Sequence, residues 1–238
     1  MTSDTLNRLA ERHPQQRLHS PSKGLSAFLH VAGLSSFAYS FNWLISNPNP
    51  VSEAFGSHWQ HLTIIGLSLS TLTFLVGLLA DLTLSRRLFT LKNVLSVASA
   101  PLEVLISILY WGLWTLDPKL VMPDWAIVLP LHVDLAFHAV PAIVLVLDLL
   151  FFSPPYAVGA LPAFGLSGVI AVAYWFWVET CFKHNGWYPY PIFDVLDPPG
   201  RLGLFAGSAA VMTVSTLSLK WVYDRVNGRA MDEAVKPS

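Results

Sequence analysis

Six stretches of about 20 mainly apolar residues, separated by short polar connectors, constrain the fold of this chain more than any other feature. Each run is long enough to cross a bilayer core, because a helix rises about 1.5 Å per residue. We therefore predict an all-α, polytopic integral membrane bundle of six transmembrane helices. The predicted spans are 25–46, 58–84, 92–116, 125–152, 156–182 and 201–224.

The composition leaves little chain outside the membrane. Hydrophobic residues make up 53% of the 238 residues and charged residues only 12%, against about 25% charged residues in soluble domains. We predict a polar tail at 1–24, a transmembrane domain at 25–226 and a second tail at 227–238. The single cysteine, Cys181, excludes an intrachain disulfide.

The positions of the basic residues predict the orientation. The first and third connectors hold only one basic residue, Lys119, and the fifth holds Lys183 and Arg201 near its ends. Most of the other Lys and Arg residues gather in or beside the two tails and in the connector after the second run: Arg8, Arg12, Arg17, Lys23, Arg86, Arg87, Lys92, Arg225 and Arg229. The positive-inside rule therefore predicts that both termini are cytosolic. We expect an endoplasmic reticulum membrane or another endomembrane by default.

Ionisable residues inside apolar runs are the first candidates for function, because burying a charge there costs about 2.5–3.5 kcal/mol even on the lenient insertion scale. Four of them lie well inside their runs: Glu103, Asp134, His138 and Glu179. Asp81 and Asp148 lie closer to run ends, where solvation is easier, so we expect structural roles for them.

Asp134 and His138 are one helical turn apart. A carboxylate that accepts one imidazole N–H leaves the other nitrogen free to take a proton, as a general base must. A purely structural pair is one alternative. A metal site built from His138, Asp134, Glu103 and Glu179 is another, although those residues are not the commonest zinc ligands.

Acyl transfer would also need a nucleophile. The chain has no G-x-S-x-G or H-E-x-x-H motif. The hydroxyl groups on the polar faces of the runs are therefore the candidates, and the residues alone do not choose among Thr63, Ser70, Ser99 and Ser107.

Short motifs in a common order resemble the androgen-induced gene (FAR-17a-like) family of multi-span membrane proteins over roughly residues 40–225. Each motif is short and degenerate, and the resemblance rests on the fact that the motifs occur in the same order and spacing as in the family. The matching positions are Trp59-x-x-Leu62-Thr63, Asp81, Pro101, Tyr110-Trp111 with Asp117 and Pro123, Phe137-His138, and Trp187-Tyr188-Pro189-Tyr190-Pro191.

This resemblance implies a threonine hydrolase that cleaves fatty acid esters of hydroxy fatty acids. The nucleophile of the family falls on Thr63 and its catalytic histidine on His138, with Asp134, Glu103 and Glu179 as supporting candidates. No metal or organic cofactor is implied. The expected partner is a membrane lipid substrate, and no nucleic acid is expected.

One difference from the family and one geometric mismatch do not agree with this assignment. Asp134-Leu135 stands where the family has an Asn-His pair. The predicted spans also place Thr63 about 7 Å and His138 about 20 Å from their starts, so their depths disagree. The alternatives are a metal-dependent intramembrane hydrolase and a non-enzymatic lipid-binding or transport protein.

Overall fold

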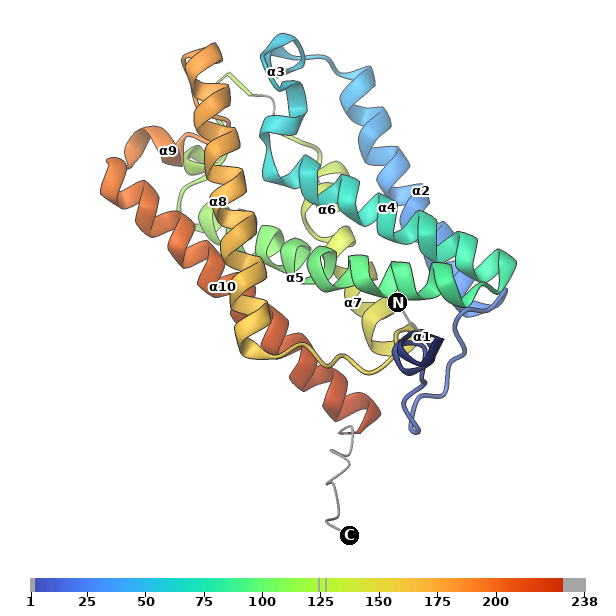
Figure 1. Ribbon diagram of the computed structural model, residues 1–238. Coiled ribbons are helices and arrows are strands. Elements are labelled where there is room, and N and C mark those ends of the chain that lie inside the picture. The colour runs from blue at the N-terminus through green and yellow to red at the C-terminus, as the bar shows by residue number, and fades with distance from the viewer. Residues whose placement is uncertain (1–2, 124, 127, 229–238) are drawn as a thin grey trace.

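The computed structural model describes residues 3–123, 125–126 and 128–228, so most of the predicted tail at 227–238 lies outside the described residues (Figure 1). Within these ranges the chain forms helices, turns and loops and no β-strand. The elements are α1 (Ser3–Leu9), α2 (Leu25–Ser46), α3 (Pro50–Glu53), η1 (Ser57–Gln60), α4 (Leu62–Thr83), α5 (Arg86–Leu116), η2 (Pro118–Leu120), α6 (Leu131–His138), α7 (Val140–Phe152), α8 (Ala160–Asn185), α9 (Ile192–Val195) and α10 (Pro198–Asn227).

Helix α5 runs through the middle of the bundle and packs against α4, α7 and α10 (Figure 1). Helix α2 covers α4, and α8 covers α10 on the opposite side. The main hydrophobic core lies between α2, α4, α5 and α7 and includes Phe37, Leu67, Phe74, Ala100, Leu145 and Leu149. A second cluster, with Tyr174, Val178 and Phe205, joins α8 to α10.

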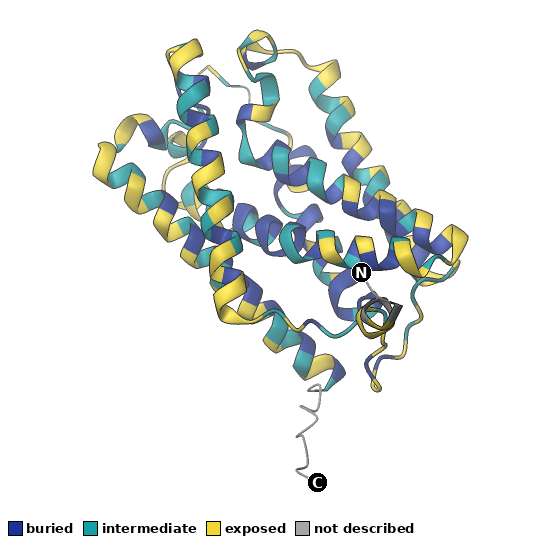
Figure 2. Cartoon of the chain, in the orientation of Figure 1, coloured by how far each residue is buried: buried dark blue, intermediate teal, exposed yellow. Residues whose placement is uncertain are grey.

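Four of the described helices are long and apolar enough to cross a membrane: α4, α5, α8 and α10. The bent pair of α6 and α7 would make a fifth span. Large apolar side chains such as Phe164 and Phe176 on α8 and Val214 on α10 are exposed, and exposed residues recur along both helices (Figure 2). A helix that is apolar on its exposed side is suited to contact lipid rather than water.

The fourth predicted span, 125–152, is not one continuous helix. Its regular part begins at Leu131, directly after Pro130, and breaks at Ala139 (φ −132°), where α6 and α7 meet at a bend of 43°. Pro141 at the start of α7 explains the break, because proline lacks an N–H and its ring crowds the carbonyl four residues earlier. His138 is therefore only seven residues from the start of its helix, about 10 Å.

The third predicted span also begins earlier than expected. Helix α5 starts at Arg86, where the Ser85 side chain accepts a hydrogen bond from the Leu88 N–H at 3.4 Å. Lys92 was predicted in a connector, but it lies in the second turn of α5 and is fully buried. It therefore contributes no positive charge to the membrane surface.

Candidate functional site

The Asp134–His138 pair is formed at the C-terminal end of α6. The Nδ1 atom of His138 lies 2.8 Å from Asp134 Oδ1, so the carboxylate accepts one imidazole N–H and leaves Nε2 free of that contact. Both side chains are nearly buried. The i, i+4 spacing on one helix is the local reason for the contact.

Two aromatic residues of α5 hold the His138 ring. Tyr110 stacks flat on the imidazole, with ring centroids 3.4 Å apart and an interplanar angle of 5°. Trp111 donates its indole N–H to the His138 backbone carbonyl at 3.3 Å. The break after α6 and the tryptophan thus fix the backbone at His138, while Asp134 and Tyr110 fix its ring.

Thr63 lies in the first turn of α4 and lines the same cavity as His138. This cavity has a volume of about 450 Å³ and lies between the C-terminal end of α2, the start of α4, the loop before α6, and the loop after α8. The late start of α6 places His138 nearer to the start of its helix than the sequence predicted, and both residues line this one cavity. Of the four candidate hydroxyls, only Thr63 lines either of the cavities described here.

A smaller cavity of about 90 Å³ meets the first at Thr63. It extends between α4, α5, α8 and α10 and is lined mainly by aliphatic and aromatic side chains. The two cavities share Thr63, Tyr110, Val121 and Tyr190. Thr63 therefore stands at the junction of two chemically different spaces.

Two residues outside the helices define the electrostatics around Thr63. Burial lowers the pKa of His61 to about 4, so this residue of the larger cavity is neutral near pH 7. Burial raises the pKa of Tyr190, and hydrogen bonding to Thr63 opposes that rise. His61 and Tyr190 thus add two neutral polar groups to the lining of the cavity near Thr63.

The other two predicted carboxylates are elsewhere. Glu103 is buried between α4 and α5, where its Oε1 accepts a hydrogen bond from the Ser70 hydroxyl at 2.9 Å. Glu179 accepts one from the Tyr188 hydroxyl at 3.1 Å and lies 3.7 Å from Arg201. Neither lines either cavity. Among the described residues no three His, Cys, Asp or Glu side chains are placed to hold a metal ion, so the predicted four-residue metal set is not assembled.

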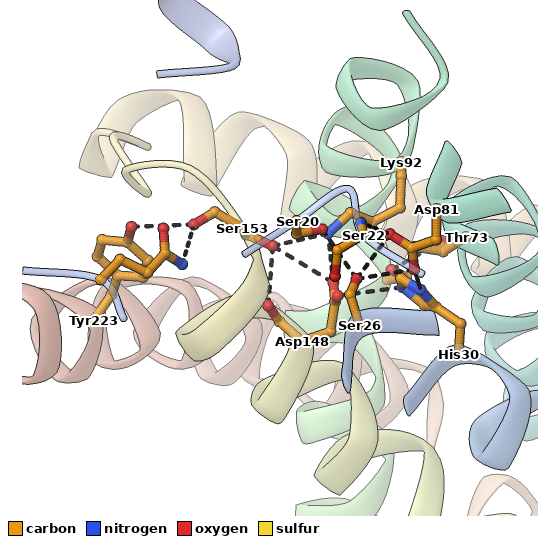
Figure 3. Close-up of polar contacts among 12 residues, drawn as sticks. Ser20, Ser22, Ser26, His30, Thr73, Asp81, Lys92, Asp148, Ser153 and Tyr223 are labelled. Atoms are coloured by element: carbon orange, nitrogen blue, oxygen red, sulfur yellow. Dashed lines mark hydrogen bonds and ion pairs between the residues drawn. The ribbon is translucent and has the colours of Figure 1, made fainter. Parts of the chain in front are cut away.

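A second buried polar cluster, which the sequence did not predict, lies at the other end of α4 (Figure 3). His30 contacts Asp81 at 2.7 Å through Nδ1 and lies 3.2 Å from Asp148 Oδ1 through Nε2. Lys92 donates to Asp148 at 2.8 Å and to Ser153 at 3.1 Å. Asp81 and Asp148 are fully buried, contrary to the expected solvation near span ends.

This cluster is structural and is separate from the cavity at Thr63. Asp81 follows Thr63 by eighteen residues, about 27 Å along α4. The cluster joins α2, α4, α5 and α7 by pairing His30 and Lys92 with two buried carboxylates. Gly77 makes room for it, because a Cβ atom there would meet His30 Nε2 at 2.4 Å.

The fold and the buried polar sites describe a multi-span helical membrane protein. The family model described as "FAR-17a/AIG1-like protein" matches residues 25–224. A UPF0641 membrane protein from Schizosaccharomyces pombe is 35% identical over 206 residues, which cover 86% of this chain and 92% of that protein. The chain belongs to the FAR-17a/AIG1-like family of membrane proteins. No solved structure matches it.

Proposed function

We propose that this protein is an intramembrane lipid ester hydrolase in which Thr63 is the nucleophile and His138 its base. The observation that carries the proposal is that Thr63 and His138, 75 residues apart in sequence, line one cavity, where Asp134 fixes the imidazole. A threonine hydroxyl is a weak nucleophile unless a positioned base takes its proton. Fatty acid esters of hydroxy fatty acids, the substrates implied by the family resemblance, are the first esters to test.

The reaction needs no group beyond the chain and water. The Thr63 Oγ1 attacks the ester carbonyl carbon while His138 Nε2 takes the hydroxyl proton. The tetrahedral intermediate collapses, the bond to the alcohol oxygen breaks, and His138 returns the proton to that oxygen. Water then attacks the acyl-threonine with His138 again as the base, which releases the acid and restores Thr63.

Two features of the fold support these roles. Hydrogen bonding of Nδ1 to Asp134 sets the tautomer in which Nε2 accepts the proton, and the same carboxylate stabilises the imidazolium that forms. Thr63 is in the first turn of α4, where the helix dipole favours negative charge. This dipole would help to stabilise the oxyanion of the intermediate.

We propose further that α2 is the sixth span and that both termini are cytosolic, in the endoplasmic reticulum or another endomembrane. Helix α2 is 22 residues long. Its most polar buried group, His30, is paired inside the bundle with Asp81, while Phe28, Val31 and Ile45 are exposed. Such a helix presents an apolar surface to lipid despite its modest average hydropathy.

Covalent labelling tests the proposed nucleophile directly. A fluorophosphonate probe should form an adduct on Thr63 of the purified protein, identified by mass spectrometry, and His138→Ala should abolish it. Thr71→Ala is the matched control, because Thr71 is on the same helix, donates to the Leu67 carbonyl at 2.7 Å and lines neither cavity. Labelling that is unchanged in Thr63→Ala would mean that another residue is the nucleophile, and a wild-type protein that is not labelled would favour a non-catalytic lipid-binding role for the cavities.

A further inference from the structure

The two cavities that meet at Thr63 differ in chemistry. The smaller one contains few polar side chains, and those that it does not share with the larger cavity have hydroxyls that already have partners. Ser167 donates to the Ala163 carbonyl at 2.9 Å and Ser208 to the Leu204 carbonyl at 2.8 Å. The Tyr174 hydroxyl donates to the Gln60 carbonyl at 2.9 Å. The rest of the lining is largely hydrocarbon, so the cavity offers a ligand almost nothing except apolar contact.

The larger cavity has more polar side chains in its lining than the smaller one, although apolar residues still make up most of it, and no Asp, Glu, Lys or Arg is among its described lining residues. Its polar side chains include Asn47, Asn49, His58 and His61 as well as the catalytic pair of the proposal. The Nδ1 atom of His61 is buried and has no hydrogen-bond partner within the chain. Because burial also keeps this imidazole neutral near pH 7, it is suited to bind an uncharged hydroxyl or carbonyl group.

The position of His138 determines which side of a bound ester faces each cavity. His138 lines the larger cavity and not the smaller one. In ester cleavage the base must return its proton to the leaving alcohol oxygen, so the alcohol side of the ester has to face His138. The acyl side then points the other way, into the smaller cavity.

We propose that the smaller cavity binds the acyl chain of the substrate and the larger cavity binds its alcohol part, with His61 as a specificity-determining contact for an uncharged polar group. This assignment rests on the proposed function. After the alcohol leaves, the larger cavity admits the water that His138 activates, while the acyl group stays on Thr63 in the smaller cavity. Phosphate-headed lipids are excluded as substrates, because no described cation in the larger cavity would replace the lost hydration of the phosphate.

The acyl assignment is tested by narrowing the smaller cavity. Ala209 is buried on α10 and lines it, whereas its neighbour Ala210 is exposed. Ala209→Phe should lower kcat/KM for 4-methylumbelliferyl palmitate about tenfold relative to the butyrate, the effect of excluding roughly two methylene groups. Ala210→Phe is the matched control and should leave the ratio unchanged. Ala171→Leu narrows the same cavity from α8 and should act in the same direction if Ala209→Phe does not fold.

The alcohol assignment is tested at His61. The ring of His61 packs edge-on against Tyr190, with centroids 5.3 Å apart, and His61→Phe keeps a ring there while removing both nitrogens. The test compares two octanoyl esters, one with a hydroxylated alcohol part and one with an aliphatic alcohol part. His61→Phe should lower the ratio of their kcat/KM values about tenfold and leave the dependence on acyl length unchanged. Phosphatidylcholine should be cleaved by neither protein.

The outcomes separate this inference from the proposed function. Suppose that hydrolysis depends on Thr63, but that Ala209→Phe changes the alcohol preference or leaves the acyl-length preference unchanged. The assignment of the two cavities would then be wrong, while the proposed hydrolase function would stand. Photo-crosslinking measures where the acyl chain binds without requiring hydrolysis. We expect palmitic acid with a diazirine at its chain end to crosslink to α8 and α10 in both the wild type and Thr63→Ala. Ala209→Phe should reduce these crosslinks. Crosslinks to residues 43–51 would reverse the assignment, and the expected crosslinks without any hydrolysis would overturn the proposed function alone.

Discussion

The buried cluster of His30, Asp81, Lys92 and Asp148 makes a sharp prediction about stability. Lys92→Met keeps an unbranched apolar side chain of similar length but removes the cation 2.8 Å from Asp148. Both side chains are fully buried, so the Asp148 carboxylate would lose its Lys92 partner at a site shielded from solvent. Removing one partner of a buried ion pair costs about 3–5 kcal/mol.

For a chain of this size, that loss corresponds to a fall of roughly 10 °C in the melting temperature of the detergent-solubilised protein. Fluorescence-detected size-exclusion after heating measures it. Arg87→Met is the control, since Arg87 lies in the first turn of the same helix and is exposed, and it should shift the melting temperature by less than about 2 °C.

The double variant Lys92→Met/Asp148→Asn, compared with the two single variants, completes a double-mutant cycle for this ion pair. It removes both charges together, so it should recover most of the stability lost in Lys92→Met. A Lys92→Met protein that melts with the Arg87→Met control would refute the view that Lys92 neutralises a buried carboxylate. A double variant less stable than either single variant would refute the pairing of these two residues.

Three further predictions follow from other parts of the structure. Gly77→Ala should lower the melting temperature because its Cβ would displace His30, whereas Gly203→Ala should be neutral because that position faces open space; equal melting temperatures would contradict the close approach. The pKa of His61 is lowered by folding to about 4, so its contribution to stability is complete above about pH 6.5 and declines as the pH falls towards 4. A scan of melting temperature against pH should therefore be flatter in His61→Phe, and identical profiles would refute a buried neutral imidazole. In a Cys181→Ser background, cysteines introduced at Ser3 and Ser52 should react with an impermeant thiol reagent from opposite sides of the membrane, and reaction from the same side would end the six-span topology.

The helices could largely be predicted from the sequence, because apolar run length and connector polarity are local properties. The predictions from sequence were wrong where a contact between distant segments of the chain overrode a local sequence pattern. Lys92 looked like a connector residue, since lysine is rarely fully buried without a partner. Its partner Asp148 is 56 residues away. Pro130 marks the start of α6 and Pro141 explains the break before α7, but the consequence for the position of His138 needed the structure.

For the candidate site, too, contacts within one helix could be predicted from the sequence, whereas contacts between helices could not. The Asp134–His138 contact was predictable, because i, i+4 neighbours on a helix are close whatever surrounds them. The choice of Thr63 came from family resemblance alone, since four hydroxyls satisfied the helical spacing equally. Glu103 and Glu179 shared the polar faces of their helices, but helical spacing does not specify the neighbour that a face meets. In the structure they meet Ser70 and Tyr188 instead.

The central claim is that Thr63 and His138 act as one catalytic unit, and ester hydrolysis by the purified protein tests it most directly. Thr63→Ala, His138→Ala and the double variant should each lose nearly all activity, by similar factors, because residues that act as a unit do not lose activity additively. Thr71→Ala should keep the wild-type rate, and all four proteins should melt within a few degrees of one another. Hydrolysis of lipid esters by Thr63→Ala at the wild-type rate would contradict the account.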